Sequence, residues 1–177
     1  LWHGSLPVGG PETRALLAFL PKIARSRLGA ELALPSIATW WCGQQAERRH
    51  VIENFDRMMI GPALSTRLAF EDESATVLGS TLKRPAREAM LARLAQHGDT
   101  LVGQEAVTLS TTPVFVNGWL EPRPASLRVY LARTADGWTV MPGGFARVGS
   151  ALDATAIAMQ KGGQAADVWV VARKPVE

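Results

Sequence analysis

The sequence predicts an α+β fold whose sheet is largely antiparallel and flanked by helices. Two observations carry this prediction. Helical spacing dominates residues 1–99, whereas short β-prone runs separated by turn residues dominate residues 100–177. Because the helices come early and the hairpins late, we expect antiparallel pairing rather than a doubly wound parallel sheet. A length of 177 residues suits one domain, so we expect a single α+β unit over 1–177.

The first predicted helix covers residues 12–29. Apolar residues recur on one face of this segment, and Gly29 is placed to end the helix. Pro21 should kink the helix or split it in two. The basic residues along it indicate a solvated face; they are Arg14, Lys22, Arg25 and Arg27.

Further elements follow before residue 100. Residues 31–43 are β-rich, residues 45–55 return to helical spacing, and residues 58–60 predict a short strand. Residues 61–82 lack periodicity and predict a long loop, with room for one short strand near 67–70. Pro85 opens a helix that runs to His97. Its inward positions are Met90, Leu91 and Leu94.

From residue 100 the chain consists of short β-prone runs. They are LVGQEAVTL, TPVFVNG, SLRVYLART, GWTVMPG and DVWVVAR. The Asp-Gly pair of ADGWT lies between two of these runs and is a strong hairpin signal. We expect one antiparallel sheet over about 100–173, with the helices over 12–29 and 84–97 covering apolar faces.

Composition excludes several classes of function. No apolar run reaches the roughly 20 residues of a membrane helix, so we expect no membrane partner. The net charge of +3 is too small and too scattered to argue for nucleic acid. The single Cys42 excludes an internal disulfide framework and favours a reducing compartment, the cytoplasm. The sequence does not begin with Met and shows no signal peptide at its start, so we expect a fragment of a longer protein.

Motifs for metal, nucleophile or phosphate loop are missing from the sequence. His3, His50 and His97 show no paired-ligand spacing with Cys42, which argues against zinc. Cys42 follows two tryptophans, which favours packing over nucleophilic chemistry. What remains is a set of polar and glycine residues on the late strands: Gln104, Glu105, Arg128, Gly143, Gly144, Arg147, Gln160, Gly162 and Gly163. Each alone fits a solvated strand face or a hairpin turn. Together, guanidinium groups and backbone N–H donors favour a phosphate or carboxylate ligand.

Four ordered segments resemble the second half of the circularly permuted ATP-grasp proteins. They are LPSIATWWCGQ, VGQEAVTLSTTPVF, LRVYLARTADGWTVMPGGFARVG and QKGGQAADVWVV, and the resemblance runs from about Thr13 to Val171. It implies an ATP-grasp fold and an ATP-dependent carboxylate–amine ligase, in which an amine attacks an acyl phosphate. The cofactors that it implies are ATP and Mg²⁺. The implied partners are the missing N-terminal half of the same protein, an all-helical companion domain called alpha-E, and a small amine or carboxylate or peptide substrate.

The resemblance also assigns roles to single residues. Gln104 and Glu105 look like the polar end of the hinge beside adenine, and Arg128 is similar to an arginine that faces phosphate or substrate. Through MPGGFARV the resemblance places Gly143, Gly144 and Arg147 along the cleft. Through QKGGQAAD the resemblance identifies four candidate ligand contacts, which are Gln160, Gly162, Gly163 and Asp167. Arg128 and Arg147 are therefore the candidate catalytic residues, no metal ligand is identified, and we expect Gln104, Arg128, Arg147 and Gly162–Gly163 to converge on one cleft.

Two positions depart from the family pattern. Gly61 stands where the family has a phosphate-binding lysine, and Ala166 replaces a second lysine. Losing a cation beside a triphosphate costs several kcal/mol of transition-state stabilisation. One hypothesis is therefore a ligase with Lys83 or Lys161 as displaced cations. The other is a catalytically inactive ATP-grasp-like binding or scaffolding module; without the resemblance, the interpretation that remains is a plain structural α+β fragment.

Overall fold

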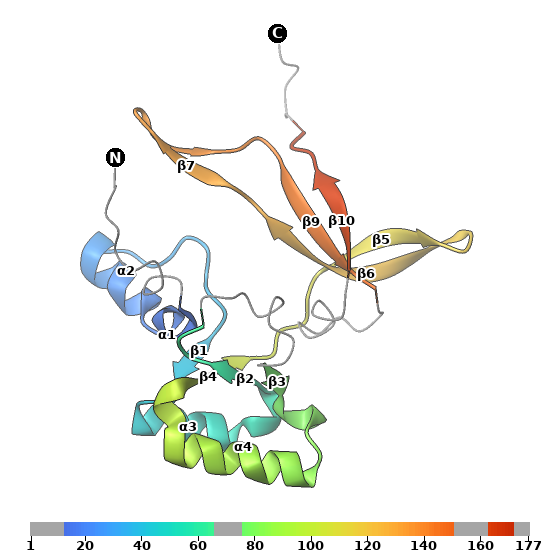
Figure 1. Cartoon of the computed structure of the whole chain (residues 1–177). Coiled ribbons are helices and arrows are strands. Elements are labelled where there is room, and N and C mark those ends of the chain that lie inside the picture. Colours follow the sequence, from blue (N-terminus) through green and yellow to red (C-terminus); the bar gives the residue numbers. More distant parts are fainter. Residues whose placement is uncertain (1–12, 66–75, 151–162, 172–177) are drawn as a thin grey trace. The chain divides into compact units, whose positions relative to one another are not determined.

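The computed structural model describes residues 13–65, 76–150 and 163–171 (Figure 1). The chain divides into two compact units, Leu1–Val107 and Thr108–Glu177, and each is described by itself. The division lies close to residue 100, where the sequence changes from helical to β-prone. The single unit over 1–177 stays a prediction.

The helices of the described residues all lie in the first unit. The α-helices are α1 (Arg14–Leu17), α2 (Leu20–Leu28), α3 (Gln45–Glu53) and α4 (Arg84–His97), and short 3₁₀ turns cover Phe55–Arg57, Gly79–Thr81 and Gly98–Thr100. The predicted first helix is split, as expected, because Pro21 occupies the first turn of α2. Gly29 ends α2 in the left-handed conformation, with φ 64°. None of the helices in these ranges is long and apolar enough to cross a membrane.

The first unit contains a four-stranded antiparallel sheet with the order β1-β4-β2-β3. Its strands are β1 (Thr39–Trp41), β2 (Met58–Pro62), β3 (Val77–Leu78) and β4 (Leu101–Glu105). The loop predicted over 61–82 thus contains a short strand and a 3₁₀ turn, while the strand expected near 67–70 lies outside the described residues.

One face of this sheet is covered by α3 and α4 (Figure 1). The fully buried residues of this core come from both helices, from two strands and from the 3₁₀ turn that begins at Phe55, and they include Val51, Phe55, Met58, Ile60, Leu94 and Leu101. Met90 and Leu91 pack against it, which confirms the predicted inward face of α4. A smaller cluster of Ala15, Ala63, Val102 and Trp41 lies where α1 packs on the sheet.

The second unit is built from strands alone in its described residues. The strands β5 (Thr111–Val116), β6 (Trp119–Arg128), β9 (Gly144–Gly149) and β10 (Gly163–Val168) form an antiparallel sheet with the order β10-β9-β6-β5. The strands β7 (Leu131–Thr134) and β8 (Gly137–Val140) form a separate hairpin. The predicted hairpin is confirmed: Thr134 pairs with Gly137, so Ala135 and Asp136 form the turn, and Gly137 begins β8 with φ 120°.

The expectation of one sheet over 100–173 is wrong, although the antiparallel pairing is confirmed. The strands in this range belong to three sheets, because β4 pairs with β1 and β2 of the first unit. Its residues Leu101 and Val102 are almost completely buried, and the apolar surface that covers them comes from segments earlier in the chain. Local β propensity does not determine which strands pair with each other, so the sequence alone could not assign β4 to the sheet of the first unit.

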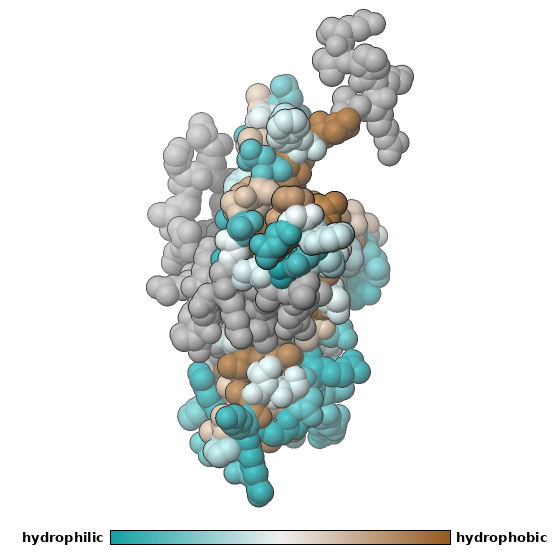
Figure 2. Space-filling model, turned by 90° about the vertical axis from the view of Figure 1, so that its right-hand side faces the viewer, coloured by the Kyte–Doolittle hydropathy of each residue, from teal (hydrophilic) through white to brown (hydrophobic). Residues whose placement is uncertain are grey.

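Two strand boundaries also differ from the prediction. The first half of β6 contains Pro122 and Pro124, which argue against a central strand. It forms because only β5 pairs with it there, whereas β9 pairs with residues 125–128. At the other end, β10 stops at Val168, and the apolar residues 169–171 beyond it are exposed. Exposed apolar side chains are common on the strands of this unit (Figure 2).

Candidate functional site

The end of β4 positions the two residues that were expected beside adenine. Gln104 lies opposite Thr39 of β1 and Met59 of β2, and its Nε2 donates to Thr39 Oγ1 at 3.1 Å. The Glu105 carboxylate accepts a hydrogen bond from Arg57 Nη2 at 3.3 Å. The backbone N–H of Glu105 donates to Ala38 O at 3.0 Å, so this amide is already engaged within the chain. The side-chain amide and carboxylate also have hydrogen bonds within the chain, but each of these groups can form more than one, so they are the polar groups that this strand end could present to a ligand.

The strand β2 ends close to the same residues, and Gly61 is part of it. Strand alternation puts Gly61 and Met59 on one face of β2, and Met59 pairs with Gln104. Gly61 is therefore on the same sheet face as Gln104. This face is opposite the one covered by α3 and α4, to which Met58 and Ile60 point.

The second unit brings the two candidate arginines together. Arg128 of β6 lies opposite Phe145 of β9, and Arg147 lies opposite Ser126, two residues from Arg128. Directly opposed residues share a face, and so do residues two apart on one strand. Arg128 and Arg147 therefore lie on the same face of the sheet as diagonal neighbours, which favours a common anion site.

The strand β10 adds a carboxylate to this face. Asp167 lies opposite Phe145, and Ala165 lies opposite Arg147. Asp167 is thus on the arginine face, whereas Ala166 lies opposite Ala146 and belongs to the other face. A lysine at position 166 would project from the side of the sheet away from Arg128 and Arg147. The loss of that lysine therefore removes no charge from the arginine face.

The glycines expected along the cleft are mostly engaged in local structure. The N–H of Gly143 donates to Met141 O at 2.8 Å, and Gly144 begins β9 opposite Val168. A side chain on Gly144 would meet Arg128 O at 2.7 Å, so the sheet requires glycine there. Gly163 begins β10 opposite Gly149, and Gln160 and Gly162 lie outside the described residues. Gly144 and Gly163 therefore serve close strand packing and Gly143 a local turn, and the ligand role expected for these glycines stays a prediction.

Gln104 and the two arginines belong to different units. The expected convergence of Gln104 with Arg128 and Arg147 therefore stays a prediction, whereas the pairing of the two arginines on one face is an observation.

The displaced cations proposed from the sequence are not found beside Gly61. Lys83 precedes α4 and is exposed, and α4 packs against the opposite face of the sheet. Lys161 lies outside the described residues.

Sequence reasoning missed Arg14, which was assigned to a solvated face. Its neighbours Lys22, Arg25 and Arg27 are exposed as predicted, but Arg14 is only 6% exposed. The signal that could have found it is Gly61 itself, because a glycine inside an apolar strand indicates close approach by another group.

The donor groups within each unit, taken separately, suit an anion better than they suit a metal ion. Guanidinium groups on the sheet faces of both units are suited to phosphate oxygens. Within the described ranges, no three residues among His, Cys, Asp and Glu gather as ligands for a metal ion. Burial raises the pKa of the Cys42 thiol to about 11, which makes it unsuited to metal binding or nucleophilic attack at neutral pH.

Comparison with known proteins gives one consistent result. A family model described as circularly permuted ATP-grasp type 2 matches residues 6–149. A putative glutamate–cysteine ligase of Frankia casuarinae is 26% identical over 93% of this chain, and the match covers 18% of that protein. An uncharacterized protein of Synechocystis is 23% identical over 92% of this chain and 33% of its own length. An uncharacterized protein of Mycobacterium tuberculosis is 24% identical over 93% of this chain, and the match covers 29% of that protein. The chain therefore spans a third or less of these relatives.

Proposed function

Because this chain belongs to the circularly permuted ATP-grasp family, type 2, we propose that it is one part of an ATP-dependent carboxylate–amine ligase. The similarity to two proteins named putative glutamate–cysteine ligases supports a ligase-like role. We propose that the reaction joins a small carboxylate to a small amine. The reducing compartment favoured by the single cysteine supports a cytoplasmic setting for it.

The observation that carries this proposal is the common sheet face of Arg128 and Arg147. In acyl-phosphate formation a carboxylate oxygen attacks the terminal phosphorus of ATP, and ADP leaves. Negative charge on the transferring phosphoryl oxygens needs fixed cations around it. Two guanidinium groups at diagonal positions suit this task, because each offers planar N–H donors to two oxygens. Bound Mg²⁺ would supply further charge neutralisation between the phosphates.

The roles proposed for the remaining residues follow from their chemistry. Gln104 and Glu105 would hold the polar edge of adenine through the amide and carboxylate of their side chains. Asp167 lies on the arginine face, where a carboxylate can orient Arg147 or accept a proton from the attacking amine. We propose that an N-terminal half of the protein, outside this sequence, completes the cleft; the chain spans a third or less of these relatives.

The test uses the complete protein with ATP, Mg²⁺ and a panel of amino-acid carboxylates and amines. ADP release that depends on both a carboxylate and an amine is the expected result. Arg128→Ala and Arg147→Ala should each lower the rate by roughly 100-fold or more. Arg133→Ala is the matched control, because Arg133 lies on the separate β7–β8 hairpin, and its rate should stay within about twofold. If no pair of substrates raises ADP release above the background without protein, the ligase proposal is wrong.

A second candidate function rests on Gly61 and Ala166, which supply no charge where the resemblance has lysines. In this case the chain is an inactive binding or scaffolding module, with the alpha-E domain as its proposed partner. This candidate predicts that the complete protein forms a stable complex with a co-expressed alpha-E domain and releases no ADP with any substrate pair. Turnover at ordinary enzyme rates, roughly 1 per second or faster, would rule it out.

A further inference from the structure

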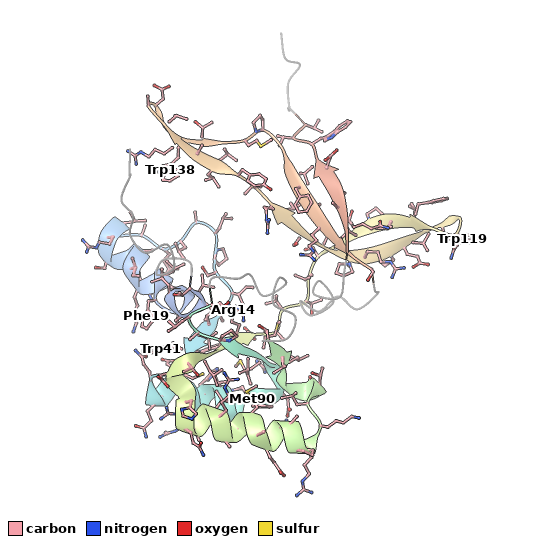
Figure 3. All side chains as sticks on the ribbon, viewed as in Figure 1. Arg14, Phe19, Trp41, Met90, Trp119 and Trp138 are labelled. Atoms are coloured by element: carbon pink, nitrogen blue, oxygen red, sulfur yellow. The ribbon has the colours of Figure 1, made fainter. Side chains whose placement is uncertain are left out.

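The sheet of the first unit carries a buried arginine beside Gly61. Arg14 is the first residue of α1 (Figure 3). It is 6% exposed, and its Nη1 donates to Thr76 Oγ1 at 2.7 Å. A Cβ atom on Gly61 would clash with Arg14 Nη1 and would lie 2.7 Å from Thr76 Oγ1. The guanidinium group therefore covers the α-carbon of Gly61.

Position 61 can hold a side chain or the guanidinium of Arg14, but it cannot hold both. A lysine at this position would project its first carbon into Arg14. The strand lysine that the resemblance expects is thus excluded by the same group that brings a positive charge to the place. The absence of a side chain at position 61 is the condition under which Arg14 can reach this strand.

Arg14 lies on the sheet face that carries Gln104. Gly61 pairs with Val102, and Met59 with Gln104, so Gln104 is displaced from Gly61 by two residues along the strands. Two residues of strand correspond to about 7 Å. Two hydroxyl groups lie near this face. Thr39 Oγ1 accepts a hydrogen bond from Gln104, and Thr76 Oγ1 accepts one from Arg14. The face thus offers an amide at one end and a guanidinium at the other.

A charge at this depth acts more strongly than one on the surface. Water and salt screen an exposed cation, whereas a buried guanidinium attracts a nearby anion through a medium of lower dielectric constant. Arginine also stays charged at every accessible pH. We propose that Arg14 supplies, from α1, the positive charge that holds the phosphates of ATP on this sheet face, in place of a strand lysine. This inference rests on the proposed ATP-dependent function.

The test measures equilibrium binding of ATP and of adenosine to the complete protein, by dialysis, at low and at physiological salt. Arg14→Met removes the charge and keeps an apolar stem. It should weaken ATP binding by roughly 10- to 100-fold and change adenosine binding by less than about twofold. Arg14→Lys keeps a charge and should lose less than Arg14→Met. Thr76→Val removes the hydrogen bond but not the charge, and it should leave ATP binding within a few-fold.

The decisive variant is the double substitution Arg14→Met, Gly61→Lys. It returns a cation to the same place from β2 after the guanidinium has gone. Thr76 Oγ1, which would lie 2.7 Å from the new Cβ, no longer accepts a hydrogen bond from residue 14 and can turn away by a χ1 rotation. ATP binding should therefore recover to within about tenfold of the natural protein. A merely structural role for Arg14 predicts equal losses for ATP and adenosine and no recovery in the double variant, and either result overturns the inference.

The closing measurement separates this inference from the proposed function. If the natural protein binds ATP and Arg14→Met binds it equally well, Arg14 has no such role while the proposed function stands. If the natural protein binds neither ATP nor adenosine, both are wrong.

Discussion

The docking of α3 on the central strand β4 depends on the missing side chain at Gly103, and the substitution Gly103→Ala tests this. A Cβ atom on Gly103 would lie 2.5 Å and 2.8 Å from the two Cγ atoms of Val51. Carbon atoms in contact prefer about 3.5–4.0 Å, so the new methyl group would be about 1 Å too close. Val51 is fully buried in α3, and a β-branched residue in a helix has one strongly preferred χ1 rotamer. The valine cannot rotate away, and helix and strand must separate.

Overpacking of this kind costs about 2 kcal/mol. For a unit of this size that lowers the Tm by roughly 10 °C. The helices of the described residues all lie in the first unit, so the helical circular dichroism signal reports unfolding of that unit. Denaturant unfolding followed by this signal gives the free energy of unfolding for each variant.

Val51→Ala provides the partner variant for a double-mutant cycle. It removes both Cγ atoms and should by itself cost about 2 kcal/mol through the cavity that it leaves. In the double variant the methyl group introduced at position 103 fills part of this space, so the two costs should combine to about 1–2 kcal/mol less than their sum. Strictly additive costs, or a Gly103→Ala variant as stable as the natural protein, would refute the reasoning.

Four further predictions concern the core, the thiol and a hairpin. Leu94→Ala should lower the free energy of unfolding by about 2–5 kcal/mol because Leu94 is fully buried, whereas Leu64→Ala, at a position 71% exposed, should stay within about 0.5 kcal/mol in the same denaturant titration. Burial raises the pKa of Cys42 from 9.0 to about 11, so the folded protein should react with a thiol reagent at pH 8 far more slowly than the unfolded chain. Because the folded pKa lies above the unfolded one, the stability from the neutral thiol is complete below about pH 9 and is lost by about pH 11; a titration showing stability that rises over this window would contradict the shift. Gly118 has φ 92° in the β5–β6 turn, so Gly118→Ala should destabilise the hairpin by about 1–2 kcal/mol in amide hydrogen exchange, while Asn117→Gly, at φ 50°, should cost less than about 0.5 kcal/mol.

Much of the secondary structure follows from local sequence signals. Pro21 splits the first helix, Pro85 lies in the first turn of α4, and Asp136 with Gly137 marks the place where the chain turns from β7 into β8. Each signal acts within a few residues, through a fixed φ or a turn that tolerates positive φ. These elements could therefore be predicted without knowledge of the fold.

The candidate site was only partly predictable for a related reason. The residue types that suit an anion were visible in the sequence, and so was the family pattern that singles out Arg128 and Arg147. Their common face depends on the register of β6 against β9, in which Ser126 pairs with Arg147. A slip by one residue would move one arginine to the other face, and no local signal fixes that register.

The sequence by itself determined the fold class, the antiparallel pairing and the family, since these depend on periodicity, turn residues and ordered motifs. Only the tertiary structure decided which sheet β4 joins, that Ala166 faces away from the arginines, and that Arg14 is buried against Gly61. The physical reason is that burial and pairing depend on contacts between segments far apart in the chain. Arg14 and Thr76 are 62 residues apart and meet over Gly61 because α1 packs on the sheet in which β2 pairs with β3, the strand that directly follows Thr76.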